Sequence, residues 1–336
     1  MEILLIDNNE CTIGGHNYIY RKTLHEIQGT EIVYQVKNFT NLSKNPIKAY
    51  KEREDYFDNL PRKEIMHFLH LDVFYTFPSL FKKMKKNNVK IIGTLHWYPN
   101  KKIKSYLLKN SAKYIDTIVV HSEYIKRQLN LNGIYNVEVV DYPAFHTEDI
   151  KESLVNNDKY VNILCIGATR YDKGIDIAAK SFRYIDNNAK KYLKFVFAGK
   201  ELDNAYQLPR ELAKEYNINL EIISKSLTDE EYWNCMKNSD VILLPYRKIF
   251  TGNSGPMTDG IILDKYILGP NNGNLGYLIN KYDLGETFVQ EDEKSLGEVI
   301  SKLCDKDLVK QHSYKSELTI EKFKDKYKMI YKHFCI

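Results

Sequence analysis

The sequence predicts an α/β protein built from two βαβ domains, each with a parallel sheet. Short apolar runs of strand length alternate with segments of helical length along most of the chain. A polar stretch at residues 146–160 interrupts this alternation, which then starts again. A chain of 336 residues also exceeds the size at which a single hydrophobic core usually keeps growing. We therefore expect two Rossmann-like domains with their strand ends facing a central cleft, where ligands of such folds bind.

The first domain is expected to contain six strands, because six apolar runs are bounded by polar or turn-forming residues. These predicted strands are residues 2–6, 31–36, 64–70, 89–96, 117–120 and 137–140. Helices are expected at residues 16–28, 77–87 and 101–114, and from residue 123 onward. Residues 40–63 are charged and irregular, which predicts a loop with a short helix.

The second domain repeats the same alternation of strands and helices. Its predicted strands are residues 162–167, 194–198, 220–223 and 240–245. Its predicted helices are residues 175–186, 208–216, 229–237, 293–303 and 317–334. Thr228 or Ser226 is expected to cap the helix at 229–237, because three acidic residues follow in its first turn.

Composition predicts a soluble cytoplasmic protein. The hydrophobic content is 43% and the charged content 28%. No apolar run reaches the roughly 20 residues that a membrane span needs. The chain begins with a strand rather than a basic leader, so we expect no signal peptide. Five widely spaced cysteines without CxxC pairs indicate reduced thiols, and neither a disulfide framework nor a metal site.

Positive charge is concentrated in the first domain. Residues 61–130 hold 14 Lys or Arg against 4 Asp or Glu, and the lysines are densest between residues 82 and 104. These lysines either form an ordinary solvated helix face or bind anionic lipid headgroups. Few aromatic residues alternate with the lysines and no known nucleic-acid module is present, so nucleic acid is not expected as a partner.

The most informative stretch is residues 243–267. An apolar run ends at Pro245, and the turn-forming cluster Thr251-Gly-Asn-Ser-Gly-Pro256 follows. Pro256 suits the first turn of the apolar helix expected after this cluster. A helix that begins after a small-residue loop offers backbone N–H groups and a positive dipole end to an anion. An ordinary strand-to-helix turn would have the same pattern.

Four features of the second domain are expected to meet where its strands end. Arg170 and Lys173 follow the first strand, and Gly199 and Lys200 follow the next. Ser254 and Gly255 begin a helix, and Asp259 is expected in that helix's first turn. Cations and helix N–H groups suit a diphosphate. A carboxylate beside them suits sugar hydroxyls such as those of a ribose. Together these residues favour a nucleoside-diphosphate ligand, although a dinucleotide fingerprint G-x-G-x-x-G is absent.

These segments resemble those of retaining nucleotide-sugar glycosyltransferases of the GT-B fold, close to glycosyltransferase family 4. The resemblance covers nearly the whole chain. It is carried by the following segments: Gly167 to Gly174, Ser239 to Pro245, the frame from Thr251 to Asp259, Ile13 to Gly15, Thr94 to His96, Val120 to Ser122, and the final helix.

The resemblance implies a domain plan and a set of site residues. The N-terminal acceptor-side domain would span 1–145, the linker 146–160 and the nucleotide-sugar-binding domain 161–315, with a helix at 316–336 crossing back to the first domain. The candidate catalytic residues are His96, Lys173 and Arg170. The candidate donor-binding residues are Gly14, Gly15, Thr251, Asn253, Ser254, Gly255 and Asp259.

The sequence departs from the family at the motif of two glutamates. Thr251 and Asp259 stand at the two positions, and Ala168 stands where the family has an arginine directly after its glycine. Asp259 can still bind a ribose with a shorter reach, whereas Thr251 cannot supply the first acid's charge near the transferred sugar. We expect these changes to affect the identity of the donor sugar more than the fold.

The resemblance implies a retaining, metal-independent transferase without a cofactor. It would move a sugar from a UDP- or GDP-sugar to a glycan or lipid-linked glycan in surface polysaccharide assembly. The lysines of residues 82–104 would hold it at the inner face of the membrane. No acidic DxD-like pair follows a strand, which is why no obligatory metal is expected. The alternatives are a nucleotide-sugar epimerase of the same fold and a non-catalytic relative.

Overall fold

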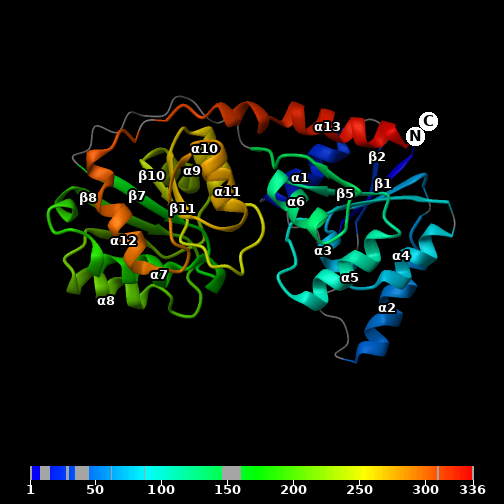
Figure 1. Ribbon diagram of the computed structural model, residues 1–336, viewed down its shortest axis with the longest axis horizontal. Coiled ribbons are helices and arrows are strands. Elements are labelled where there is room, and N and C mark those ends of the chain that lie inside the picture. Colours follow the sequence, from blue (N-terminus) through cyan, green and yellow to red (C-terminus); the bar gives the residue numbers. More distant parts are fainter. Residues whose placement is uncertain are drawn as a thin grey trace. The chain divides into compact units, whose positions relative to one another are not determined.

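The computed structural model describes residues 2–7, 16–27, 30–34, 45–61, 63–86, 88–145, 160–308 and 310–334. The chain divides into two compact units (Figure 1). Unit 1 comprises Met1–Phe145 together with Glu317–Ile336, and unit 2 comprises His146–Ser316. Most of the expected linker, residues 146–159, lies outside the described residues. Within the described part of the chain, no helix is both long enough and apolar enough to cross a membrane.

Unit 1 contains a six-stranded parallel sheet in the order β2-β1-β3-β4-β5-β6. Its strands are β1 (Ile3–Asp7), β2 (Thr30–Tyr34), β3 (Ile65–Phe68), β4 (Lys90–Thr94), β5 (Thr117–Val120) and β6 (Val137–Val139). Its helices are α1 (His16–His25), α2 (Pro46–Asp58), α3 (Leu71–Phe74), α4 (Pro78–Lys85), α5 (Lys102–Ala112), α6 (Glu123–Leu131) and α13 (Ile320–His333).

Alternate residues of the unit 1 strands enter two different cores, because successive side chains of a strand point to opposite faces. Leu4 and Ile6 of β1 pack with α2, α4, α5 and α6, whereas Ile3 and Leu5 pack with α1 and α13. The sheet is therefore covered on both faces, and the last helix of the chain supplies part of one cover.

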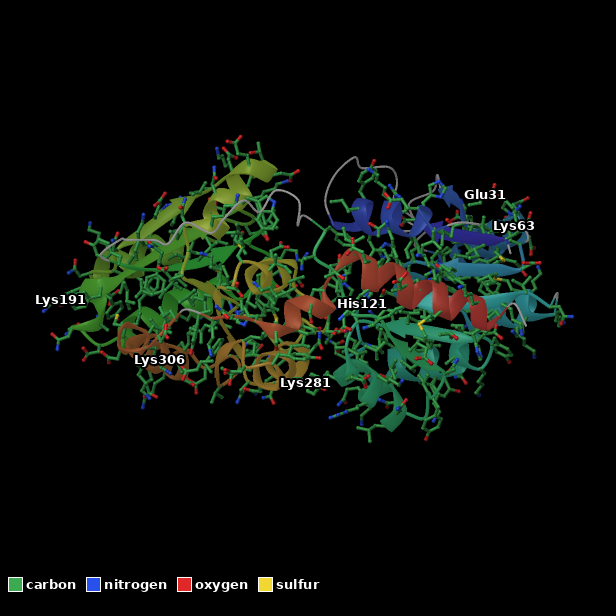
Figure 2. All side chains as sticks on the ribbon, turned by 90° about the horizontal axis from the view of Figure 1, so that it is seen from above. Glu31, Lys63, His121, Lys191, Lys281 and Lys306 are labelled. Carbon is green, nitrogen blue, oxygen red and sulfur yellow. The ribbon has the colours of Figure 1, made fainter. Side chains whose placement is uncertain are left out.

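An ion-pair cluster lies at the amino ends of the first strands. The Lys63 ammonium lies 3.2 Å from carboxylate oxygens of both Glu2 and Glu31 (Figure 2).

Unit 2 contains a second six-stranded parallel sheet, in the order β12-β11-β10-β7-β8-β9. Its strands are β7 (Val161–Ile166), β8 (Leu193–Ala198), β9 (Leu220–Ile223), β10 (Val241–Leu243), β11 (Tyr266–Pro270) and β12 (Gly285–Phe288). Its α-helices are α7 (Ile175–Ser181), α8 (Gln207–Glu215), α9 (Asp229–Lys237), α10 (Gly255–Ile262), α11 (Gly273–Lys281) and α12 (Glu293–Ser301).

Helices cover both faces of this sheet as well. One core joins the sheet to α7, α8 and α12. On the other face, α10 packs so closely that a Cβ at Gly260 would lie 2.8 Å from Ile242 and 2.9 Å from Ile267. In Figure 1, α9, α10 and α11 group on one side of the unit 2 strands, and α7, α8 and α12 on the other. This arrangement of two parallel sheets confirms the predicted fold class of two Rossmann-like domains.

Three features of the secondary structure differ from the sequence prediction. Residues 46–58 form a 13-residue helix with Asn45 as its N-cap, where a loop with only a short helix was expected. The apolar helix after Pro256 ends at Ile262, because Asp264 adopts a left-handed conformation and Tyr266 already begins β11. Because α10 begins at Gly255, Asp259 lies in its second turn rather than the first. The strands β11 and β12 and the helices α3 and α11 were not expected.

Gly174 of unit 2 is required by both conformation and space. Gly174 has φ +65°, in the left-handed region, and a Cβ on it would lie 2.0 Å from the carbonyl oxygen of Pro245. The backbone after β7 therefore contacts the backbone after β10 directly. Gly273 is left-handed too, with φ +73°, but a Cβ there would meet nothing within 4 Å.

We predict that Gly174→Ala lowers the free energy of unfolding by about 3 kcal/mol or more, because the alanine adds a backbone clash to the strain of a left-handed residue. The matched variant Gly273→Ala should lower it by only about 1 kcal/mol, since it adds strain alone. Urea unfolding followed by circular dichroism measures both values. Equal losses in the two variants would contradict the close approach to Pro245.

Candidate functional site

Lys173 lies where the carboxyl ends of β7 and β10 meet. It is the last residue of the 3-10 turn Tyr171–Lys173, which follows β7 and leads into α7. The Lys173 ammonium lies 3.8 Å from the ring centroid of Tyr246 and 4.4 Å from that of Phe250. Both aromatic residues come from the loop after β10. A cation held over two ring faces keeps its charge at a fixed position while the rings exclude water from it.

The surroundings of Lys173 disfavour its charge. Burial, and next the nearby Arg170 guanidinium, lower the pKa of the Lys173 ammonium to about 7, while Asp172 and Cys165 act in the opposite direction. The two rings therefore compensate only part of the lost hydration. An anion placed beside Lys173 would favour the protonated form, so this side chain is a ready partner for a phosphate.

Arg170 lies close to Lys173 but has its own partner. Its Nε and Nη2 donate to the two carboxylate oxygens of Asp172, at 3.0 and 2.7 Å, and the side chain remains 49% exposed. This ion pair raises the pKa of the Arg170 guanidinium and lowers that of the Asp172 carboxyl group. A ligand that binds Arg170 would have to share the guanidinium with Asp172.

Arg247 is a second arginine at this edge of unit 2, and the sequence did not single it out. Its Nη2 lies 2.8 and 2.7 Å from the two carboxylate oxygens of Asp176, and its guanidinium stacks over Tyr171 at 4.1 Å. Its backbone N–H donates to the carbonyl oxygen of Asp172. The only sequence signal is its place two residues after Pro245, where the apolar strand ends.

The expected donor-binding loop before α10 is held by internal hydrogen bonds. Ser254 is the N-cap, and its hydroxyl oxygen accepts from the Met257 N–H at 3.3 Å. The same hydroxyl lies 3.2 Å from the hydroxyl of Tyr246, whose ring carries the Lys173 ammonium. Asn253 accepts a hydrogen bond from the side chain of Asn274 in α11. Ser254 and Lys173 thus share Tyr246 as a neighbour.

Thr251 and Asp259 occupy different environments. Thr251 is partly buried in the loop, with Gly255 and Pro256 four and five residues further on. Asp259 is only 1% exposed, and its Oδ2 accepts a 2.6 Å hydrogen bond from the Tyr232 hydroxyl of α9. Burial and the Asp259 charge raise the pKa of Tyr232 well above its ordinary value, so this hydroxyl stays protonated. One carboxylate oxygen of Asp259 is therefore already engaged.

In unit 1, histidines follow three neighbouring strands at their carboxyl ends. His70 follows β3, His96 follows β4 and His121 follows β5. The ring centroids of His70 and His96 lie 4.8 Å apart, and those of His96 and His121 lie 4.9 Å apart. Tyr142, after β6, continues the row at 5.2 Å from His121. Asp7 ends β1 beside them, 3.5 Å from His70 and 2.6 Å from Arg21.

These imidazoles are neutral. Burial lowers the pKa of all three, to about 3 for His121, which is 4% exposed and is labelled in Figure 2. His96 Nε2 lies 2.9 Å from the carbonyl oxygen of Leu69, to which it donates, so its Nδ1 is the acceptor nitrogen. His121 donates from Nδ1 to the carbonyl oxygen of Val140, and within the described residues its Nε2 has no hydrogen-bond partner.

The structure places the predicted site residues in three groups. The unit 2 group lies around the loops that follow β7 and β10 and in the helix α10 that comes next: Arg170, Lys173, Thr251, Asn253, Ser254, Gly255 and Asp259. His96 lies in the histidine row of unit 1. Gly14 and Gly15 lie outside the described residues.

Three side-chain features were not predicted. They are the aromatic pair Tyr246 and Phe250, the Tyr232–Asp259 hydrogen bond, and the row that His70 and His121 form with His96. Each histidine directly follows an apolar run, a pattern that could have indicated the row.

No metal site emerges from the part of the chain that the structure describes. Among these residues, no group of three or more His, Cys, Asp or Glu side chains could hold a metal ion. The described cysteines Cys165, Cys235 and Cys304 are free thiols. Metal independence stays a prediction from the sequence.

We predict that unit 1 loses stability as the pH falls from about 6.5 to 4. The pKa values of His67 and His121 are lowered to about 3 in the folded state, by burial first and then by the nearby His96. The unfolded chain therefore binds protons at these residues near pH 6.5, whereas the folded chain does not. The two histidines alone should lower the free energy of unfolding by about 3 kcal/mol per pH unit in this window.

Urea unfolding between pH 7 and 4.5 measures this slope. The variant His121→Gln should reduce the slope by roughly 1 kcal/mol per pH unit, because one proton fewer is taken up. The control His25→Gln should leave it unchanged, since His25 is exposed. An unchanged slope in His121→Gln would show that His121 is not held neutral in the folded protein.

Solved structures of the same fold match the whole chain at low sequence identity. The N-terminal domain of Candida albicans trehalose-6-phosphate phosphatase has a TM-score of 0.75 and 11% identity, covering 100% of this chain and 97% of that chain. A UDP-forming α,α-trehalose-phosphate synthase from Burkholderia xenovorans, in complex with glucose-6-phosphate, has a TM-score of 0.70 and 9% identity, covering 100% of both chains. Anabaena HepE, in complex with UDP and glucose, has a TM-score of 0.70 and 10% identity, covering 99% of this chain and 100% of that chain. These likenesses show the GT-B fold.

Sequence comparison gives the family. No curated protein sequence matches the chain. The family model described as glycosyl transferases group 1 matches residues 146–317, about half of the chain, including the loop that carries Lys173 and the segment from Thr251 to Asp259. This chain therefore belongs to the group 1 glycosyl transferases and is a glycosyltransferase.

Proposed function

We propose that this glycosyltransferase transfers a sugar from a UDP- or GDP-sugar with retention of anomeric configuration. The observation that carries the proposal is the Lys173 ammonium, held over Tyr246 and Phe250 beside the N-cap of α10. Support comes from the neighbours of the same fold, one a UDP-forming synthase and one solved with UDP and glucose. A GDP-sugar is an alternative donor, because UDP and GDP carry the same diphosphate, which is the part of the donor that Lys173 would contact.

Lys173 would act on the leaving group. Transfer releases a nucleoside diphosphate, and negative charge develops on its β-phosphate as the glycosidic bond breaks. A cation already placed and partly desolvated stabilises this charge without reorganising water, which is often the largest contribution to catalysis. Arg170 would add a second positive charge from the same loop, shared with Asp172. The first-turn N–H groups of α10 would add a positive dipole end.

His96 is proposed to contact the transferred sugar. Because its Nε2 donates to Leu69, its Nδ1 offers a hydrogen-bond acceptor to a sugar hydroxyl. Its backbone N–H is anchored by Asp72, at 3.1 Å, which fixes the start of the loop after β4. Burial lowers the pKa of His96, so the ring stays neutral and does not serve as a proton donor near pH 7.

Asp259 is proposed to bind the ribose of the donor. Its Oδ2 is held by Tyr232, which orients the carboxylate before any ligand arrives. A fixed, buried carboxylate would discriminate in favour of a ligand that supplies hydroxyl donors. Thr251 would lie on the sugar side, as in the resemblance, and would determine sugar preference through a neutral hydroxyl. No divalent metal or cofactor is proposed.

A lipid-linked glycan is proposed as the acceptor, with α5 as the surface that meets an anionic membrane. The expected basic surface at 82–104 is not uniform in the structure. On α4, Lys83 pairs with Glu54 and Asp58 of α2, and Lys85 pairs with Asp116. The positive charge of α4 is therefore partly neutralised by acids that are distant in the sequence.

The start of α5 has a different surface. Lys101, Lys102 and Lys104 are exposed, and no residue from 101 to 113 is acidic. Ile103 is 62% exposed and Tyr106 61% exposed on the same helix. Lysines flanking exposed apolar side chains suit the interface of an anionic bilayer, where the lysines contact headgroups and the apolar groups enter the boundary region. Such a membrane role fits an enzyme of surface polysaccharide assembly.

We predict that UDP or GDP raises the melting temperature of the protein. A ligand that binds only the folded state stabilises it by mass action. Binding should also take up a fraction of a proton at pH 7.5 to 8, because a diphosphate raises the pKa of Lys173 from about 7. Affinity should therefore fall as the pH rises above about 7.

Calorimetry in two buffers of different ionisation enthalpy measures the proton uptake. Lys173→Met should weaken binding about tenfold or more and abolish the uptake. Lys173→Arg should keep part of the affinity without the uptake. The control Lys191→Met, at an exposed lysine of the same unit (Figure 2), should change neither. Absence of any nucleotide effect on the wild type would refute the donor assignment.

We predict that reversing three charges on α5, by Lys101→Glu, Lys102→Glu and Lys104→Glu together, lowers affinity for liposomes containing phosphatidylserine at least about tenfold. Each lysine near an anionic surface contributes about 1 kcal/mol. The matched triple reversal on α4, at Lys82, Lys83 and Lys86, should lower it less, because Lys83 is already paired. Liposome sedimentation measures both. Equal binding by the α5 variant and the wild type would remove the membrane proposal.

A further inference from the structure

A chain of buried hydrogen bonds connects the last helix to the sheet of unit 1. The hydroxyl of Tyr327 in α13 is hydrogen-bonded to that of Tyr20 in α1, and it lies 3.0 Å from the Thr94 hydroxyl at the end of β4. Thr94 is hydrogen-bonded to Nε2 of His67 at 2.8 Å. The other ring nitrogen of His67 lies 2.8 Å from the Tyr331 hydroxyl of α13. This series of hydrogen bonds therefore begins at Tyr20 in α1 and ends at Tyr331 in α13. Between them it passes through residues of α13, β4 and β3.

All five groups are uncharged and enclosed. Their side chains are at most 3% exposed. Burial lowers the pKa of His67 to about 3 and raises the pKa of Tyr20, Tyr327 and Tyr331 above the ordinary tyrosine value. A neutral imidazole carries one N–H, so His67 donates at one end and accepts at the other. Each buried polar group is thus satisfied by its neighbours, and removing one member takes a hydrogen bond from each group beside it.

Tyr20 connects this chain to the histidine row. Its ring centroid lies 5.3 Å from that of His96 and 5.8 Å from that of His121, both in edge-on contact. It also stacks on Tyr142 at 5.9 Å. Thr94 adds a second connection, because it precedes His96 by only two residues along the backbone. Tyr327 thus is hydrogen-bonded to two residues that adjoin His96, one through its ring and one along the backbone.

We propose that Tyr327 is a positioning residue for the transfer site, acting on His96 through Tyr20 and Thr94. The last helix, α13, then both covers the sheet of unit 1 and helps to hold the histidine row in position. This inference rests on the proposed role of His96 as the residue that contacts the transferred sugar. Tyr327 itself touches no reacting atom in this account.

Tyr331 provides a matched control within the same helix. It lies one turn further along α13 and is 0% exposed like Tyr327. Its hydrogen bond to His67 is at the opposite end of the hydrogen-bond series from Tyr20. Tyr327→Phe and Tyr331→Phe each remove one buried hydroxyl from α13. Only the first removes the hydrogen bond between Tyr327 and the Tyr20 hydroxyl. A merely structural role for α13 would make the two variants behave alike.

The first experiment is nuclear magnetic resonance of the full chain labelled with 15N in its histidines. Long-range 1H–15N spectra report the tautomer and surroundings of each imidazole. Tyr327→Phe should shift or broaden the ring signals of His96 and His121, and Tyr331→Phe should perturb His67 while leaving those two in place. Tyr20→Phe, which keeps the ring, should act in the same direction as Tyr327→Phe. The same pattern of shifts in both α13 variants would overturn the proposal.

The second experiment measures transfer kinetics with the donor that the nucleotide screen identifies. Tyr327→Phe should lower kcat about tenfold, because a displaced contact to the sugar raises the barrier, while the donor KM changes less than about twofold. Tyr331→Phe should keep kcat within about threefold. Activity that merely follows the folded fraction in both variants would contradict positioning. If the wild type transfers no sugar, the proposed function fails, whereas the spectra still test the positioning.

Discussion

The close approach of Gly174 to Pro245 is the constraint on which the candidate donor site depends. The backbone after β7 turns in a left-handed conformation directly against the carbonyl oxygen after β10. Only a residue without a Cβ fits there. This contact places Lys173 over Tyr246 and Phe250, and Tyr246 in turn contacts the N-cap Ser254 of α10. One backbone contact thus connects the cation, the aromatic rings and the helix start.

Unit 1 differs from unit 2 in that its central polar side chains are enclosed and uncharged. His70, His96 and His121 follow successive strands as neutral rings, of which His121 is buried and the other two are partly buried. Helix α13 covers one face of the sheet with tyrosines that satisfy His67 and Thr94. The helix therefore contributes both apolar cover and hydrogen-bond partners. This explains why a segment so distant in the sequence belongs to the first unit.

The sequence predicted the fold better than the partners within the site. Alternating apolar runs located most strands of both sheets, and the order of residues from Gly167 to Gly174 located Lys173. The sequence could not show that Arg170 pairs with Asp172, or that Lys83 pairs with acidic residues of α2, because such pairs depend on the folded structure. The strand β12 and the helix α11, which each begin with glycine, were missed, and β11 was missed because it follows α10 within one apolar segment that was expected to be helical. The Tyr232–Asp259 bond joins two helices and left no local signal.

The central claim is that Lys173 and the start of α10 bind the diphosphate of a nucleotide-sugar donor. A crystal structure of the protein with bound UDP or GDP tests it most directly. The account predicts a phosphate oxygen within hydrogen-bond distance of Lys173 Nζ and of an N–H in the first turn of α10. A nucleotide bound elsewhere, with the Lys173 ammonium still lying over Tyr246 and Phe250 and touching no phosphate, would contradict it.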